Sequence, residues 1–117
     1  MTKKILIVDD DQITVKYLDA LFSDNGYETM IASDGVEAEK AVKEVKPDLI
    51  TLDLEMPREW GPRFYQKMIK MPGYDEIPVI VISGLSNSKH SINKAIAILN
   101  KPFDSDKLLG IVKRTIG

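Results

Sequence analysis

Carboxylates, a hydroxyl and an amine stand where short apolar runs of this sequence end. Three consecutive acids, residues 9–11, follow the apolar run 5–8, and Asp53 follows a second run. Ser83 ends a third run, and Lys101 comes shortly after a fourth. Hard oxygen ligands favour magnesium, while a lysine and a hydroxyl suit the oxygens of a phosphoryl group. The residue types therefore indicate magnesium-assisted phosphoryl chemistry, in which a carboxylate can act as the nucleophile and form an aspartyl phosphate.

The acids among these residues need a compensating positive charge. Two carboxylates about 5 Å apart repel each other by roughly 3 kcal/mol at an effective dielectric constant of about 20. Lys101 supplies one positive charge, and a divalent cation supplies two. Magnesium usually keeps several waters while it joins carboxylates to phosphate oxygens. A crevice that gathers these acids is therefore expected to bind Mg²⁺.

The apolar runs alternate along the chain with segments of helical periodicity. The expected strands are residues 5–8, 27–32, 49–52, 77–82 and 97–99, and the expected helices are 12–22, 36–45, 63–70, part of 88–94 and 105–115. Short runs that are apolar on both faces are typical of buried parallel strands. Strict alternation with helices predicts an α/β fold with a doubly wound, five-stranded parallel sheet. Because open parallel sheets bind ligands at the carboxyl ends of their strands, the polar residues should share one crevice.

Length and composition indicate one soluble domain. The 117 residues are 44% apolar and 29% charged, which suits a single globular domain spanning 1–117. The chain has no cysteine, which fits a reducing cytoplasm. Its apolar runs fall far short of the roughly 20 residues that span a bilayer. With a net charge of −2, the composition does not favour nucleic acid or an anionic membrane as a direct partner.

Four segments resemble the signature segments of the response-regulator receiver domain, a chemotaxis-regulator-like family of two-component signalling. They are 5–10 (ILIVDD), 48–57 (DLITLDLEMP), 77–83 (IPVIVIS) and 101–103 (KPF), and they stand in the family's order and at its spacing. The resemblance covers essentially the whole chain. It implies a flavodoxin-like fold with strand order 2-1-3-4-5.

The resemblance also implies a function and partners. A phosphoryl group would pass from the phosphohistidine of a sensor histidine kinase or histidine phosphotransfer protein to the domain, with Mg²⁺ as cofactor. The domain would then signal to a downstream output domain or protein by a population shift between two conformations. It would catalyse only its own phosphorylation and dephosphorylation, as a monomer or a weak phosphorylation-dependent dimer.

Individual residues match the family's metal site. Asp53 matches the phosphoacceptor, which also faces the metal. Asp10 matches the acid that binds the metal directly, and Asp9 matches the acid that assists through water. The backbone carbonyl of Glu55 matches a further protein ligand of the metal. The resemblance therefore implies Mg²⁺ bound by these four residues.

Two more residues match the family's phosphate contacts. Ser83 matches the serine or threonine that contacts the phosphoryl oxygens and reorients on activation. Lys101 matches the lysine that pairs with the phosphoryl group. The bond from Lys101 to Pro102 resembles one that is cis in this family.

Three features depart from the family's pattern. Ile98 stands where the family usually has Tyr or Phe, and it lacks the ring and hydroxyl on which the family's two-residue switch depends. The stretch from Ser83 to Lys101 is shorter than usual by about four residues, roughly one helical turn. The fourth helix is therefore expected to be short, displaced or partly irregular, and the family's usual dimer and output face is affected. Glu55 adds a carboxylate that either lies over the site or points to solvent.

Plainer interpretations stay open for single residues. Residues 9–11 suit the N-terminus of a helix, where one acid suffices as a cap and Asp11 is best placed. Ser83 can be an ordinary hydroxyl at a strand end, and Lys101 can be a solvated lysine. His90 is the only histidine and is expected to be exposed.

Other classes of protein compete with the receiver interpretation. A pseudo-receiver would serve only as a protein-interaction module, and Ile98 and the shortened fourth helix favour it. A flavodoxin-like cofactor protein is disfavoured because the loop after the first strand is rich in Asp, which would repel a flavin phosphate. A metal-dependent phosphohydrolase also begins with acids on a parallel sheet. However, the second acid and the lysine spacing suit a receiver better, and no substrate-specificity cap is present.

Overall fold

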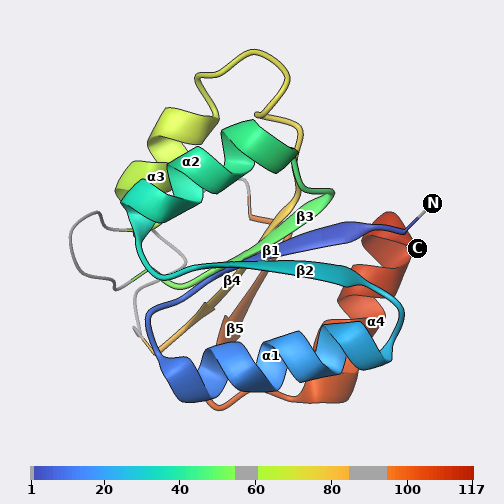
Figure 1. Cartoon of the computed structure of the whole chain (residues 1–117). Coiled ribbons are helices and arrows are strands. Elements are labelled where there is room, and N and C mark those ends of the chain that lie inside the picture. Colours follow the sequence, from blue (N-terminus) through green and yellow to red (C-terminus); the bar gives the residue numbers. More distant parts are fainter. Residues whose placement is uncertain (1, 55–60, 85–94) are drawn as a thin grey trace.

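Five parallel strands form one sheet with helices on both faces (Figure 1). The computed structural model describes residues 2–54, 61–84 and 95–117. The strands are β1 (Lys4–Val8), β2 (Glu28–Ala32), β3 (Leu49–Leu52), β4 (Val79–Ser83) and β5 (Ala97–Asn100). The helices within the described residues are α1 (Gln12–Asp24), α2 (Gly35–Val45), α3 (Gly61–Met68) and α4 (Ser105–Ile116). The strand order is β2-β1-β3-β4-β5, which confirms the predicted fold class.

The sheet separates two apolar layers. In Figure 1, α1 and α4 lie against one face of the sheet, and α2 and α3 lie against the other. Side chains alternate across a strand, so Leu6 and Val8 belong to the same cluster as buried residues of α2 and α3. Ile5 and Ile7 belong to the cluster that includes buried residues of α1 and α4. The first strand is apolar on both faces because helices cover both faces.

Aspartates begin three of the helices. Asp11, Asp34 and Asp104 each accept a hydrogen bond from a backbone N–H in the first turn of α1, α2 and α4 respectively. These bonds satisfy N–H groups that have no partner within the helix. The predicted cap at Asp11 is confirmed. After α1 the chain turns at Gly26, whose φ of +89° suits glycine.

Several element boundaries differ from the sequence pattern by one or two residues, and two of these differences lie beside a proline. α3 begins at Gly61 rather than at Arg63, because a proline in the first turn of a helix has no N–H that the helix would need. β4 begins at Val79 rather than at Ile77, because Pro78 cannot donate a ladder hydrogen bond. The helix expected within 88–94 lies outside the described residues. Within the described ranges, no helix has the length and apolar character needed to cross a membrane.

Thr51 of β3 carries a buried hydroxyl, and the described part of the chain offers it no hydrogen-bond partner. The residue is paired with Ile7 on one side and Ile80 on the other. An unsatisfied buried hydroxyl costs about 1–3 kcal/mol, and valine has nearly the same shape without it. We expect Thr51→Val to raise the free energy of unfolding by about 1 kcal/mol in urea denaturation.

Thr29 provides the matched control for this substitution. Its hydroxyl donates to the carboxylate of Asp19, so Thr29→Val removes a hydrogen bond that is made. That variant should lose about 1 kcal/mol of unfolding free energy. Equal destabilisation by Thr51→Val and Thr29→Val would show that the hydroxyl of Thr51 is satisfied in solution.

Candidate functional site

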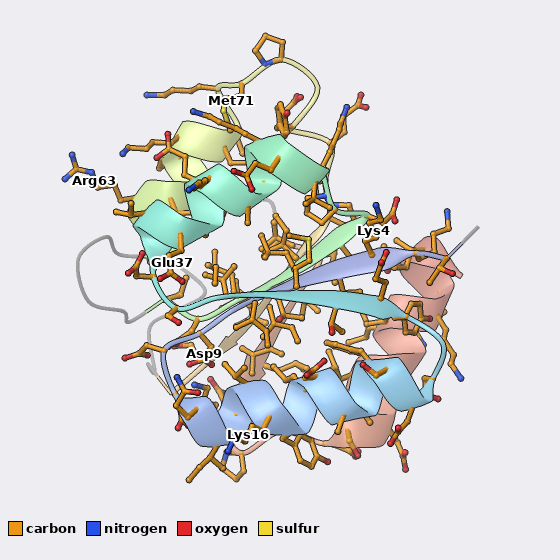
Figure 2. The ribbon with its side chains drawn as sticks, in the orientation of Figure 1. Lys4, Asp9, Lys16, Glu37, Arg63 and Met71 are labelled. Carbon is orange, nitrogen blue, oxygen red and sulfur yellow. The ribbon has the colours of Figure 1, made fainter. Side chains whose placement is uncertain are left out.

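The carboxyl ends of β1 and β3 bring three of the predicted acids together. The N–H of Asp9 donates to the carbonyl of Ala32 (3.1 Å), and the N–H of Asp53 donates to the carbonyl of Val8 (2.9 Å). Both acids thus continue the pairing of the sheet just past the strands, and Figure 2 shows Asp9 at the end of β1. Carboxylate oxygens of Asp9, Asp10 and Asp53 lie within 4.8 Å of one another. The structure therefore gathers the acids that the sequence placed 43 positions apart, from Asp10 to Asp53.

Burial differs among the three acids. Asp9 is 3% exposed and Asp53 is 6% exposed, whereas Asp10 is exposed to solvent. Buried carboxylates are stable only when a cation or hydrogen bonds compensate them. Asp10 leaves one side of the cluster open to water. Three carboxylates with an open side fit Mg²⁺, which takes oxygen ligands and keeps several of its waters.

Within residues 2–54, 61–84 and 95–117, Lys101 is the cation that faces this cluster. Its Nζ lies 2.8 Å from Oδ2 of Asp9 and 3.9 Å from Oδ2 of Asp53. Burial lowers the pKa of the Lys101 ammonium, but the hydrogen bond to Asp9 and the charges of Asp53 and Asp9 outweigh burial. The pKa of Lys101 is therefore held above its usual value, and the side chain stays charged across the neutral range. The bond from Lys101 to Pro102 is cis, as predicted.

Ser83 lies at the end of β4, between the acceptor strand and the lysine. The pairing of Leu52 with Val81 places Ser83 one position further along its strand than Asp53. Its carbonyl accepts the N–H of Lys101 at 3.1 Å, and its side chain is fully buried. The structure therefore places Ser83 at the same edge of the sheet as the acids. Glu55, the fourth predicted metal ligand, lies outside the described residues.

Asp11 belongs to the helix rather than to the acid cluster. Its carboxylate accepts hydrogen bonds from the hydroxyl of Thr14 (2.7 Å) and the N–H of Ile13 (3.2 Å). The Thr14 hydroxyl, above all, holds the pKa of Asp11 below its usual value. The N–H of Asp11 also donates to Oδ1 of Asp9 (2.9 Å), which helps to orient that acid. Of the three consecutive acids, Asp9 and Asp10 therefore belong to the acid cluster and Asp11 caps α1.

A groove of about 550 Å³ opens beside the cluster, between the start of α1 and the loop after β5. Two of its apolar side chains are well exposed, Ile13 at 80% and Tyr17 at 50%. The rings of Tyr17 and Phe103 meet edge to face, with centroids 5.7 Å apart. The lining residues are Asp11, Ile13, Thr14, Tyr17, Lys101, Pro102 and Phe103. The sequence pattern assigned Ile13 and Tyr17 to the apolar set of the helix, and their exposure was not foreseen.

This fold and this edge of acids, serine and lysine define a class of protein. Residues 5–113 match the family model of the response regulator receiver domain, and the chain belongs to that family. Receiver domains of this family are signalling domains of two-component systems. The predicted family is therefore confirmed.

Two relatives show how far the likeness extends in sequence. Protein Rrf1 of Nitratidesulfovibrio vulgaris Hildenborough is 35% identical over 116 residues, which cover 99% of this chain and 84% of that protein. The Regulator of RpoS of Escherichia coli K12 is 41% identical over 85 residues, which cover 73% of this chain and 25% of that protein. The matched part of the chain thus spans about a quarter of the second relative's length.

Solved structures agree with the fold. The chemotaxis response regulator CheY4 of Vibrio cholerae superimposes with a TM-score of 0.90 at 27% identity, covering 99% of this chain and 100% of that one. The receiver domain of the sensor histidine kinase PA1611 of Pseudomonas aeruginosa has a TM-score of 0.91 and covers 100% of this chain and 99% of that one. That domain was solved with a magnesium ion coordinated in its active-site cleft. At 22% identity this second likeness shows the fold alone.

Proposed function

We propose that residues 1–117 form one receiver domain that accepts a phosphoryl group on Asp53 from a partner phosphohistidine, with Mg²⁺ as cofactor. One observation carries the proposal. The buried carboxylate of Asp53 lies within 4.8 Å of the carboxylates of Asp9 and Asp10, and its Oδ2 is 3.9 Å from Nζ of Lys101. In this set Asp53 can act as the nucleophile, the neighbouring carboxylates can hold a metal ion, and Lys101 can neutralise the phosphoryl oxygens.

The chemistry follows from the placement of these residues. An oxygen of Asp53 attacks phosphorus, the bond from phosphorus to the donor's histidine nitrogen breaks, and that nitrogen keeps the electron pair. Asp9 and Asp10, with Asp53 and the carbonyl of Glu55, would hold Mg²⁺, which supplies positive charge to the phosphoryl oxygens. Lys101 supplies a further positive charge at the same oxygens, and Ser83 a hydroxyl donor.

A direct assay tests the proposal. The protein is incubated with acetyl phosphate and Mg²⁺, and intact-mass spectrometry measures the fraction that carries one phosphoryl group. We expect an adduct that forms with Mg²⁺, is suppressed by EDTA and maps to the peptide that contains Asp53. A protein that stays unmodified under these conditions would overturn the proposal.

The groove beside the site supports a protein donor. Ile13 and Tyr17 expose apolar surface next to Lys101, where a partner that brings its phosphohistidine to Asp53 would contact them. We expect Ile13→Ala to slow phosphotransfer from the partner histidine kinase by about fivefold to tenfold, since one apolar interface contact is worth about 1 kcal/mol. Labelling by acetyl phosphate, which is too small to need the groove, should keep its rate.

Ile96 offers the matched control for the groove. It is an isoleucine that is 45% exposed, and it precedes β5 rather than lining the groove. Ile96→Ala should leave both phosphotransfer rates unchanged. An Ile13→Ala variant that the kinase phosphorylates at the wild-type rate would show that the donor docks elsewhere.

A pseudo-receiver remains the second candidate, and Ile98 favours it. This side chain lies in β5 opposite Val81 and packs, half-buried, against the cluster beneath α2 and α3. It has neither a ring nor a hydroxyl with which to report the state of Ser83. Beryllofluoride, a phosphoryl mimic, separates the candidates. Backbone chemical shifts that change beyond the site favour a switching receiver, and shifts that change only at the site favour the pseudo-receiver.

A further inference from the structure

A group of cations covers the outer face of α3 and the adjoining flank of α2. We call it the basic ridge, and it consists of Lys43, Lys46, Arg63, Lys67 and Lys70, all exposed. Arg63 and Lys67 lie one turn apart on α3, and Lys70 follows in the turn after the end of the helix. Residues 60–74 contain no acid. In Figure 2, Arg63 points away from the body of the molecule.

One acid ties the two parts of the ridge together. Glu39 of α2 lies 3.4 Å from Nζ of Lys43 on the same helix and 3.6 Å from Nζ of Lys67 on α3. Lys46 ends α2 with its Nζ 5.5 Å from the ring centroid of Tyr74. Among the residues that the structure describes, the ion pairs of Lys43 and Lys67 go to Glu39, and the five cations of the ridge contrast with the net charge of −2 of the whole chain.

The extent of the ridge limits what can bind it. Arg63 and Lys67 are four positions apart on α3, which is about 6 Å at 1.5 Å per helical residue, and Lys70 follows just beyond the helix. The exposed acids Glu37 and Glu44 lie on the other side of α2, so a long polyanion would meet negative charge beyond the ridge. A short acidic segment can pair with the cations and stop before those acids. Charge complementarity thus favours a short segment over DNA or an anionic membrane.

An apolar residue borders the same flank of α2. Val36 is 47% exposed, and it precedes Glu39 and Lys43 at the i+3 and i+7 spacing of one face. We propose that the basic ridge is a docking surface for a short acidic segment of a protein partner, with an apolar residue of that segment on Val36. This site lies on α2 and α3, and it shares no residue with the groove beside α1 that was assigned to the phosphoryl donor.

A labelled peptide tests this surface. The probe is a short fluorescein-labelled peptide of glutamates interrupted by leucine, and anisotropy measures its binding to the full chain at rising salt. We expect saturable binding that weakens as salt rises. The triple variant Arg63→Gln, Lys67→Gln, Lys70→Gln should bind about tenfold more weakly, since each exposed pair contributes modestly. Val36→Ser should bind about threefold more weakly.

The helix α4 offers a control with the same change of charge. Lys107, Lys113 and Arg114 are also two lysines and one arginine, all exposed, and their triple glutamine variant should bind the probe as the wild type does. If both triple variants bound the peptide equally weakly, the loss of affinity would reflect only the change in net charge, and the proposal would be overturned. Saturable binding that is absent, or unchanged in the ridge variant, would also overturn it. So would tighter binding of duplex DNA or phosphatidylserine vesicles through the ridge, because the partner would then be a polyanion.

Discussion

Asp53→Asn is expected to abolish phosphorylation of the domain. The carboxamide keeps the shape of the carboxylate but has no nucleophilic oxygen, so the acyl phosphate cannot form. Asp9 lies closer to Lys101, but both of its carboxylate oxygens accept hydrogen bonds, one from the N–H of Asp11 and one from Nζ of Lys101, so it should be the poorer nucleophile. We expect adduct formation from acetyl phosphate to fall by at least about a thousandfold, as measured by intact-mass spectrometry.

Two controls separate a loss of chemistry in Asp53→Asn from a general effect of the substitution or a loss of folding. Asp24→Asn, at the exposed end of α1, should be phosphorylated at the wild-type rate. Circular dichroism and urea denaturation should show that Asp53→Asn is folded, so that loss of the adduct reports chemistry. An adduct that persists in Asp53→Asn would place the acceptor on another acid, with Asp9 and Asp10 as the first to examine by peptide mapping.

The strand ends made much of this site predictable from sequence. Parallel strands place their carboxyl ends at one edge of the sheet. A carboxylate that follows a buried apolar run is therefore expected at that edge. This reasoning located Asp10, Asp53 and Lys101 without distances, and the structure brings them to one edge. The same reasoning located Ser83, because it ends β4.

Contacts that depend on the direction of a side chain could not be predicted from the sequence. Ile13 and Tyr17 share the helical spacing of the buried residues, but they lie on the flank of α1 that the core does not cover. Asp11 caps α1 and Asp9 joins the acid cluster because of the directions in which their carboxylates turn. The preference of Lys101 for Asp9 over Asp53 is a difference of about an ångström between two distances, 2.8 and 3.9 Å, which no spacing in sequence encodes.

Lys101→Met is expected to change metal binding and phosphorylation in opposite directions. Nζ of Lys101 lies 2.8 Å from Asp9, so the ammonium competes with a metal for the charge of this acid. A single and a double positive charge about 6 Å apart repel by roughly 1.4 kcal/mol even at the dielectric constant of water. Without the ammonium, Mg²⁺ should bind about tenfold more tightly, as isothermal titration calorimetry can measure.

Phosphorylation of the same variant should become slower. The ammonium lies near Asp53, where by our proposal it would stabilise the negative charge of the transferring phosphoryl group. The loss of one such contact slows reactions by roughly a hundredfold or more. Lys107→Met, an exposed lysine of α4, is the control and should change neither quantity. If Lys101 acted only through the metal, tighter Mg²⁺ binding would bring phosphorylation that is as fast as in the wild type or faster. Opposite signs in the two measurements therefore separate a lysine that acts on the phosphoryl group from one that only compensates the acids.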